Sequence, residues 1–239
     1  MGLHLTEIEF REDVTVSLEQ CTASDLQVAR AAWVSTKGAD AREADGRIDG
    51  LINYLTRERH GSPFEHNMFT FFIECPIFVT REFFRHRVGW SYNEWSGRYD
   101  VMRPIFYVPR RERNLVQIGK NGSYAFEQGN DFQHRLTRKI IEKNSITAWD
   151  NYDTLLSEGV AKEVARDVLP LNTFTSFYAT CNARSLMSFL SLRTEDESAT
   201  FVSRPLDEIQ LVADKMEAIF AEQMPITHEA WNRNGRVAP

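Results

Sequence analysis

One stretch of the sequence, residues 131–158, constrains the fold more than any other. Apolar side chains recur there at helical spacing, at Phe132, Leu136, Ile140, Trp149, Tyr152 and Leu156. Gly159 follows directly, and glycine commonly ends a helix because it adopts the left-handed conformation at little cost. The pattern therefore predicts one long amphipathic helix.

Other segments predict a mixture of strands and further helices. Two β-branched or aromatic runs, VTVSL at 14–18 and MFTFFIE at 68–74, are typical of strands, and residues 101–109 look extended. Residues 36–48 and the Gly/Asn-rich stretch 110–131 favour loops, the second a variable insertion. Helical spacing, capping residues and flanking prolines predict helices over 24–33, 48–57, 77–87, 161–169, 182–193 and 206–224. The fold class is therefore α+β or mixed α/β.

Composition limits the class of protein and its partners. The chain has 239 residues and a net charge of −6, and no Pro/Gly/Ser-rich linker divides it, so we expect a single domain over residues 1–239. The acidic balance argues against non-specific binding to nucleic acid or acidic membranes. The three cysteines are widely spaced, and neither a signal peptide nor a membrane-spanning run is evident. We expect a cytoplasmic protein with reduced cysteines.

The segment RHRVGWSYNEWSGRY, residues 85–99, combines cations with aromatic rings. Guanidinium groups suit bidentate contact with phosphate, and aromatic rings can stack on a flat heterocycle. The alternative is a solvated helix end with aromatic side chains in the core. The interleaving of the rings with Arg, Ser, Asn and Glu favours a nucleotide site; the rings are Trp90, Tyr92, Trp95 and Tyr99.

Two further segments could contribute polar groups to such a site. HGSPFEH, residues 60–66, has two histidines whose spacing does not match short-range zinc ligands, so we predict a turn at Ser62 and no metal site. Residues 163–193 carry polar side chains within an apolar run, either as surface ion pairs or as ligand contacts. A buried charge there needs a counter-charge. These side chains are Arg166, Asn172, Asn182, Arg184 and Arg193.

Taken together, the three segments resemble the flavin-dependent thymidylate synthases. RHR followed by S-x-N-E-x-S-x-R-Y resembles the family signature, HGSPFEH the segment before it, and EVARDVLPLN…NARSLMSFLSLR the C-terminal block. The resemblance covers roughly residues 50–109 and 145–195. It implies conversion of dUMP to dTMP with methylenetetrahydrofolate as carbon donor and FAD, reduced by NADPH, as hydride source. It also implies a central, mainly antiparallel sheet flanked by long helices, and a homotetramer with shared active sites.

The resemblance also assigns roles by position. Arg193 matches the catalytic arginine. Residues implied to lie against FAD are Ser62, Arg85, His86, Arg87, Glu94, Asn182, Arg184 and Ser188. Residues implied to hold dUMP are Glu82, Arg85, Glu94, Trp95, Ser96, Gly97, Arg98, Arg166 and Arg193. Ser96 is assigned to binding, because no His–Asp partner that could activate it is evident nearby.

The sequence departs from the family pattern in four places. Eight residues, Val88 to Trp95, separate RHR from its serine, one more than usual, and a bulge within 88–90 could absorb the extra residue. Glu82 replaces a glutamine expected to touch the nucleotide. Because a carboxylate repels phosphate, we expect Glu82 to pair with an arginine. Ser188 replaces an asparagine, and Glu197 a histidine.

Two alternatives remain open from the sequence. One is a relative that binds FAD and nucleotide but has lost or altered activity, which Glu82 and the longer signature motivate. The other is a single-stranded nucleic-acid-binding module that stacks bases on the aromatic rings. A colourless protein with steeply salt-dependent affinity would indicate the module, whereas a yellow protein without turnover would indicate the inactive relative.

Overall fold

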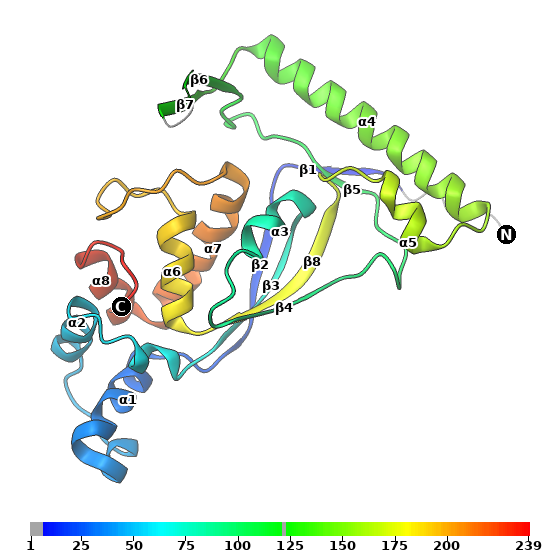
Figure 1. The fold of residues 1–239 in the computed structure, drawn as a ribbon. Coiled ribbons are helices and arrows are strands. Elements are labelled where there is room, and N and C mark those ends of the chain that lie inside the picture. Colours follow the sequence, from blue (N-terminus) through cyan, green and yellow to red (C-terminus); the bar gives the residue numbers. More distant parts are fainter. Residues whose placement is uncertain (1–6, 121–122) are drawn as a thin grey trace. The chain divides into compact units, whose positions relative to one another are not determined.

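The computed structural model describes residues 7–120 and 123–239 (Figure 1). These residues form two compact units, and each is described by itself. The first unit comprises the described part of Met1–Val14 together with Cys75–Thr80 and Trp95–Thr175. The second unit comprises Thr15–Glu74, Arg81–Glu94 and Ser176–Pro239.

A four-stranded sheet with the order β2-β3-β8-β4 lies almost entirely in the second unit. Its strands are β2 (Thr15–Cys21), β3 (Phe69–Pro76), β8 (Phe174–Cys181) and β4 (Trp90–Glu94). β2 pairs antiparallel with β3, and β4 pairs antiparallel with β8. In β3, Phe69, Phe71 and Ile73 are fully buried and alternate with half-buried residues, which gives a strand with one core face. The expected mainly antiparallel sheet and the strand predicted near 68–74 are confirmed.

The helices of the second unit are α1 (Asp25–Lys37), α2 (Asp49–Arg57), α6 (Ala183–Arg193), α7 (Asp207–Gln223) and α8 (Pro225–Arg233), with short 3₁₀ helices η1 (Gly38–Arg42) and η2 (Ser62–Glu65). Figure 1 shows α6 and α7 next to one another. Phe220 of α7 joins the helices to the sheet, since its ring centroid lies 6.2 Å from Phe69 and 6.3 Å from Trp231. These buried rings form a continuous aromatic core.

The first unit is built on the predicted long helix, α4 (Asp131–Ser157). Asn130 caps its first turn in a reciprocal capping box with Gln133. β1 (Glu9–Arg11) runs parallel to β5 (Ile105–Tyr107), and β6 (Val116–Lys120) forms a hairpin with β7 (Ser123–Glu127). The helix α5 (Lys162–Ala165) and the 3₁₀ turn η3 (Arg166–Val168) follow α4. A small core forms around Met102, Tyr152 and Ala165.

The helix predicted over 77–87 is wrong at its C-terminal end, because α3 (Ile77–Phe83) stops four residues earlier. The hydroxyl of Tyr92 lies 3.1 Å from the carbonyl oxygen of Phe83 and 3.0 Å from that of His86. It therefore occupies acceptors that a longer helix would use for its own backbone. Arg85 consequently lies outside the helix.

Other differences concern elements that local patterns did not indicate. Residues 110–131 contain the β6–β7 hairpin instead of a loop, α1 extends to Lys37, and α8 follows the helix expected to be last. β4 forms inside the segment 85–99 that combines cations with aromatic rings, and β8 forms inside the apolar run 163–193, before α6. Within the described ranges, no helix has both the length and the apolar character needed to cross a membrane.

Candidate functional site

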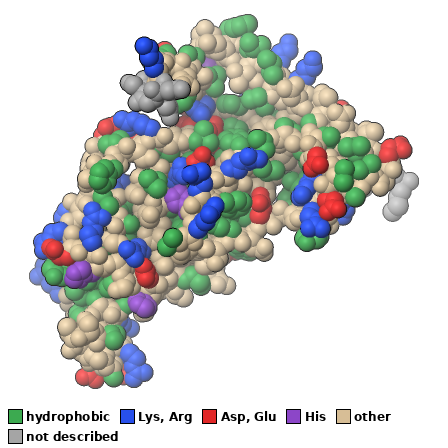
Figure 2. Space-filling model, in the orientation of Figure 1, with side chains coloured by type: hydrophobic (Ala, Val, Ile, Leu, Met, Phe, Trp, Pro, Cys, Tyr) green, Lys and Arg blue, Asp and Glu red, His purple; other side chains and the backbone are tan. Residues whose placement is uncertain are grey.

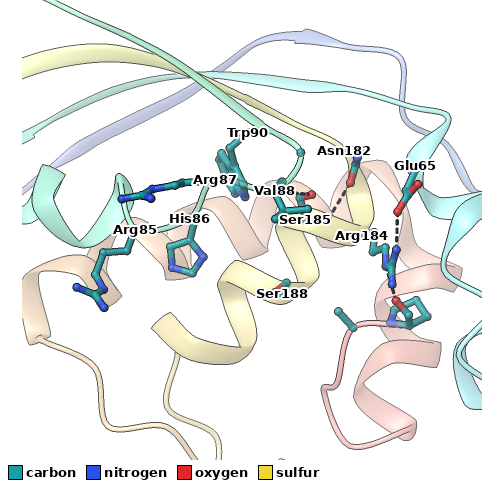
Figure 3. A pocket seen from close by; sticks show the side chains of 13 residues that line it. Glu65, Arg85, His86, Arg87, Val88, Trp90, Asn182, Arg184, Ser185 and Ser188 are labelled. Carbon is teal, nitrogen blue, oxygen red and sulfur yellow. Dashed lines mark hydrogen bonds and ion pairs between the residues drawn. The ribbon is translucent and has the colours of Figure 1, made fainter.

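A cavity of about 610 Å³ lies in the second unit, between the segment after α3 and the start of α6 (Figure 3). Figure 3 shows Arg85 and His86 on the segment after α3, with Ser188 on α6 between His86 and Arg184. The lining residues are Glu65, Arg85, His86, Arg87, Val88, Gly89, Trp90, Asn182, Arg184, Ser185, Ser188, Ala238 and Pro239.

A tight turn brings the cavity wall against α6. The backbone N–H of Trp90 donates to the carbonyl of Arg87 (3.3 Å), and Gly89 has a positive φ of 69°. A Cβ at Gly89 would lie 2.2 Å from Oγ of Ser185, so only glycine fits. The Ser185 hydroxyl donates to the carbonyl of Val88 (2.9 Å), which ties the turn to α6. This turn lies where the sequence suggested a bulge.

The first turn of α6 is satisfied mainly by side chains. Asn182 accepts the N–H of Ser185, and Asn67 accepts the N–H of Ala183, both at 2.8 Å. Two of the N–H groups that a helix start offers to anions are therefore occupied. Attraction of this wall for an anion must come mainly from arginine side chains.

Arg184 forms one end of the cavity and is fixed by two acceptors. It lies 2.5 Å from the carboxylate of Glu65 and donates through Nε to the carbonyl of Pro239 at 2.6 Å. A Cβ at Gly61 would lie 2.5 Å from Nε of Arg184 and 2.7 Å from that same carbonyl. Gly61 therefore leaves the space in which Arg184 and the end of the chain meet.

Arg193, at the end of α6, is held between a carboxylate and an imidazole. Its Nη1 lies 2.5 Å from Oε2 of Glu82, and its Nε donates to Nε2 of His86 at 3.1 Å. Burial, followed by the Arg193 and Arg85 cations, lowers the pKa of His86 to about 4. His86 is therefore neutral at pH 7 and accepts a hydrogen bond. The expectation that Glu82 pairs with an arginine is confirmed.

Two cations of the cavity have no counter-charge among the residues that the structure describes. Within the described ranges, Arg85 and Arg87 form neither an ion pair nor a hydrogen bond through their side chains. Figure 2 shows basic side chains gathered near the middle of one face, around the positions of α3 and α6 in Figure 1. Unpaired guanidinium groups beside an open cavity with a Trp90 ring suit an anionic ligand that carries a flat ring system.

A second group of predicted residues lies in the first unit. Oγ of Ser96 accepts the N–H of Arg98 (3.3 Å), and Nε of Arg98 pairs with Glu163 at 2.8 Å. Gly97 is buried, and a Cβ there would lie 3.2 Å from Cδ of Arg166. The half-buried Arg166 makes no ion pair with any described residue, so its charge is available to an anion such as phosphate.

The structure brings most of the predicted cofactor residues together. Those lining the cavity are Arg85, His86, Arg87, Asn182, Arg184 and Ser188. Ser62 lies on η2 and Glu94 at the end of β4, and neither lines the cavity. Trp95, Ser96, Gly97, Arg98 and Arg166 belong to the first unit, and Glu82 and Arg193 adjoin His86 in the second.

Several lining residues were not predicted. Glu65 lies inside the HGSPFEH segment, and an acidic residue there could have been matched to one of the arginines in 163–193. Gly89 falls within the lengthened part of the signature, where an unusual backbone conformation was expected. Nothing in the local sequence pointed to Ser185, Ala238 or Pro239.

Comparison with known proteins gives one consistent family. Residues 17–226 match the family described as "Thymidylate synthase complementing protein". A flavin-dependent thymidylate synthase of Streptomyces avermitilis is 55% identical over 234 residues, covering 96% of this chain and 95% of that protein. One from Thermotoga neapolitana is 42% identical over 220 residues, covering 90% and 89%.

Solved structures include a similar protein that is described as acting on two nucleotides. A UMP/dUMP methylase, PolB from Streptomyces cacaoi, bound with 5-Br UMP, superimposes with a TM-score of 0.91 at 48% identity, covering 98% of this chain and 100% of that one. The same enzyme bound with 5-Br dUMP gives a TM-score of 0.92.

Proposed function

We propose, given that the chain belongs to the family of flavin-dependent thymidylate synthases, that it methylates dUMP to dTMP. Methylenetetrahydrofolate would donate the carbon, and FAD reduced by NADPH would supply the hydride. The whole chain would act as one synthase domain. The observation that carries the proposal is the juxtaposition in the second unit of an arginine-lined cavity with the Glu82–Arg193–His86 cluster.

The residues of the cavity fit a flavin dinucleotide. Arg85 and Arg87 offer unpaired guanidinium groups for a diphosphate, and Asn182, Ser188 and the backbone around Gly89 offer short polar groups. A cavity of about 610 Å³ falls in the size range of cofactor sites. Flavin, when bound, would supply the hydride that reduces the transferred one-carbon unit to a methyl group.

Arg193 would bind the pyrimidine and stabilise negative charge that develops on the uracil ring as C5 becomes nucleophilic. Such stabilisation requires donors that are already fixed before the reaction. The neutral His86 and the Glu82 carboxylate fix the guanidinium of Arg193 by contacting its Nε and Nη1 atoms, respectively. We therefore assign Arg193 as the catalytic residue and His86 and Glu82 as its positioning residues.

The phosphate of the nucleotide would be held in the first unit. Ser96, Gly97 and Arg98 form a turn in which Gly97 has no side chain to keep a ligand from the backbone, and Arg166 adds a charge that has no ion-pair partner among the described residues.

The structure offers little support for nucleophilic catalysis by a cysteine thiol. Burial raises the pKa of Cys181 well above its usual range and is also the main cause of the raised pKa of Cys21, so both thiols favour the protonated, unreactive form.

UMP is a second candidate substrate. The similarity to the UMP/dUMP methylase PolB, at 48% identity over nearly the whole chain, favours testing it. Turnover measured with dUMP and with UMP at matched concentrations distinguishes the two candidate substrates. Turnover of UMP within about tenfold of dUMP, a difference of about 1.4 kcal/mol in activation free energy, would make the enzyme a methylase of both nucleotides.

We further propose a homotetramer with shared active sites, as the family resemblance implies. Apolar side chains left exposed along α4 are consistent with an oligomer interface; they are Phe132, Leu136, Ile140 and Ile146. Light scattering combined with flavin quantification tests this. A tetramer that loses flavin on dissociation is expected, and a monomer with full flavin content would contradict it.

The experiment for the proposed function starts with a visible spectrum of the purified protein. NADPH is then added anaerobically with dUMP and methylenetetrahydrofolate, and dTMP is quantified. We expect a flavin band that bleaches with NADPH, accompanied by dTMP. A flavin band without dTMP would indicate the binding-only relative, and no flavin after reconstitution with FAD would refute the assignment.

A further inference from the structure

A second hollow, of about 380 Å³, opens in the second unit between α1, η1 and η2. Gln27, Arg30, Ala31 and Val34 follow one another at the spacing of a single helical face, so this side of α1 forms its floor. Ala41 and Arg42 of η1 and His66, which follows η2, complete the lining.

The charges in this hollow have one sign. Arg30, Arg42 and His66 can each carry a positive charge, and no carboxylate is among the lining residues. This is notable in a chain whose net charge is −6. A concave surface with one sign of charge attracts ligands of the opposite sign.

Most of the donors in the hollow are unused by the protein. Nε of Arg30 donates to the carbonyl of Ala44 at 3.2 Å, which leaves its Nη groups for other acceptors. Arg42 and His66 form no side-chain hydrogen bond or ion pair with the described part of the chain. Although Asp40 and Glu43 flank Arg42 in sequence, neither lines the hollow.

Apolar groups separate these donors. Ala41 is fully buried beneath the hollow, and Val34 leaves 55% of its surface exposed beside it. The donors are flexible side chains spread along a helix, unlike the clustered backbone N–H groups that typically cradle a phosphate. Such a lining suits an extended chain of methylene and amide groups that carries several carboxylates.

The hollow is close to the flavin cavity along the chain. Glu65 lines that cavity and His66 lines the hollow, and neighbouring Cα atoms are about 3.8 Å apart. A second ligand whose reacting end lies against the flavin could therefore extend its tail across η2. Methylenetetrahydrofolate has this form, since a reactive pterin is joined through an aromatic spacer to one or more glutamates.

We propose that the hollow binds the glutamate tail of the folate co-substrate through Arg42, Arg30 and His66. The inference rests on the proposed function, because it takes the folate from that reaction. It predicts that folates with longer glutamate tails bind more tightly, since each additional carboxylate can reach another cation.

Kinetics with two folates provide the first test. KM for methylenetetrahydrofolate is measured with one and with three glutamates, at saturating dUMP and NADPH. We expect the triglutamate to have a KM several-fold lower. Arg42→Gln should reduce this preference by about fivefold, which corresponds to a loss of about 1 kcal/mol of binding free energy. Arg47→Gln is the matched control, because Arg47 is 88% exposed and outside the hollow.

A direct binding measurement separates this inference from the proposed function. Calorimetry with tetrahydropteroyl mono- and triglutamate on the flavin-loaded protein requires no turnover. Weaker triglutamate binding in both Arg42→Gln and His66→Gln, with unchanged binding in Arg47→Gln, is the expected result even if dTMP is never formed. Equal affinity for the two folates in the wild type, or an effect of Arg42→Gln on NADPH alone, would overturn the assignment.

Discussion

Nε of Arg193 lies 3.1 Å from Nε2 of His86, and the histidine is the acceptor. The imidazole can accept only when it is neutral, and its pKa of about 4 keeps it so at physiological pH. The guanidinium is thus aimed by a neutral partner on one side and by the Glu82 carboxylate on the other. An arginine fixed in this way can present its remaining N–H groups to a substrate without reorganisation.

His86 should make the stability of the protein depend on pH in a defined window. Between pH 6.5 and about 4, the unfolded state binds a proton on this histidine and the folded state does not. The free energy of unfolding should therefore fall as pH is lowered through this window, with no contribution from His86 above it. Urea denaturation at several pH values should show a smaller fall for His86→Asn than for wild type, with His60→Asn as control. Identical pH profiles for wild type and His86→Asn would contradict this.

Glu82 should act through charge and geometry on Arg193. In Glu82→Ala the guanidinium of Arg193, whose side chain is only 15% exposed, loses its counter-charge and one of its two side-chain partners. We expect kcat to fall about tenfold or more, the loss of roughly 1.4 kcal/mol of transition-state stabilisation, with a smaller change in KM for dUMP. Glu82→Gln keeps an oxygen acceptor and should restore most of kcat.

The control for Glu82 is Glu58→Gln, which removes an exposed ion pair with Arg57. Such pairs contribute little, so its kinetics should match wild type. Full activity in Glu82→Ala would show that Arg193 needs no positioning by this carboxylate.

Gly61 should be indispensable for the cavity wall. An added Cβ would meet Arg184 and the carbonyl of Pro239 at distances that force both to move. Gly61→Ala should lower the free energy of unfolding by about 1–3 kcal/mol and reduce the flavin-to-protein ratio. Gly50→Ala is the matched control, because no atom outside its chain neighbours and the backbone of its own helix α2 lies within 4 Å of the added Cβ, and it should stabilise the protein by about 0.5–1 kcal/mol. Normal flavin content and stability in Gly61→Ala would contradict the packing argument.

Arg236 should contribute strongly to stability near the end of α6. It is 5% exposed and donates to Glu217 at 2.8 and 2.6 Å and to the hydroxyl of Thr194 at 2.8 Å. Arg236→Met leaves the Glu217 carboxylate half-buried and short of a partner, at a cost of about 3 kcal/mol. The double variant with Glu217→Gln should recover part of this loss in urea denaturation. No recovery would mean that the arginine acts mainly by packing over Trp231.

Features set by neighbouring residues could be predicted from the sequence. Ser24 accepts the N–H of Gln27, Asn130 pairs with Gln133, and Gly159 ends α4 with a φ of 81°. Each of these signals acts within one helical turn, and the helices begin or end near the expected residues. The apolar strand at 68–74 has a similarly local origin, because alternation directly reflects one buried face.

Features set by distant residues could not be predicted in this way. The end of α3 depends on Tyr92, nine residues away, and the position of Arg184 depends on Glu65, 119 residues away. The pairing partner of Glu82 could be named only as an arginine, since Arg193 lies 111 residues further along the chain. The family resemblance named six of the thirteen residues that line the cavity, whereas the roles of Gly61 and Pro239 follow only from packing.

The most direct test of the account compares wild type with Arg193→Ala in the methylation reaction, with flavin content measured on the same samples. The account predicts that both proteins are yellow with similar flavin-to-protein ratios, because Arg193 is not among the residues lining the flavin cavity. Wild type should form dTMP, and Arg193→Ala should form it about a hundred to a thousand times more slowly, on the scale of a lost electrostatic stabiliser. Undiminished dTMP formation by Arg193→Ala would contradict the central role given to this residue.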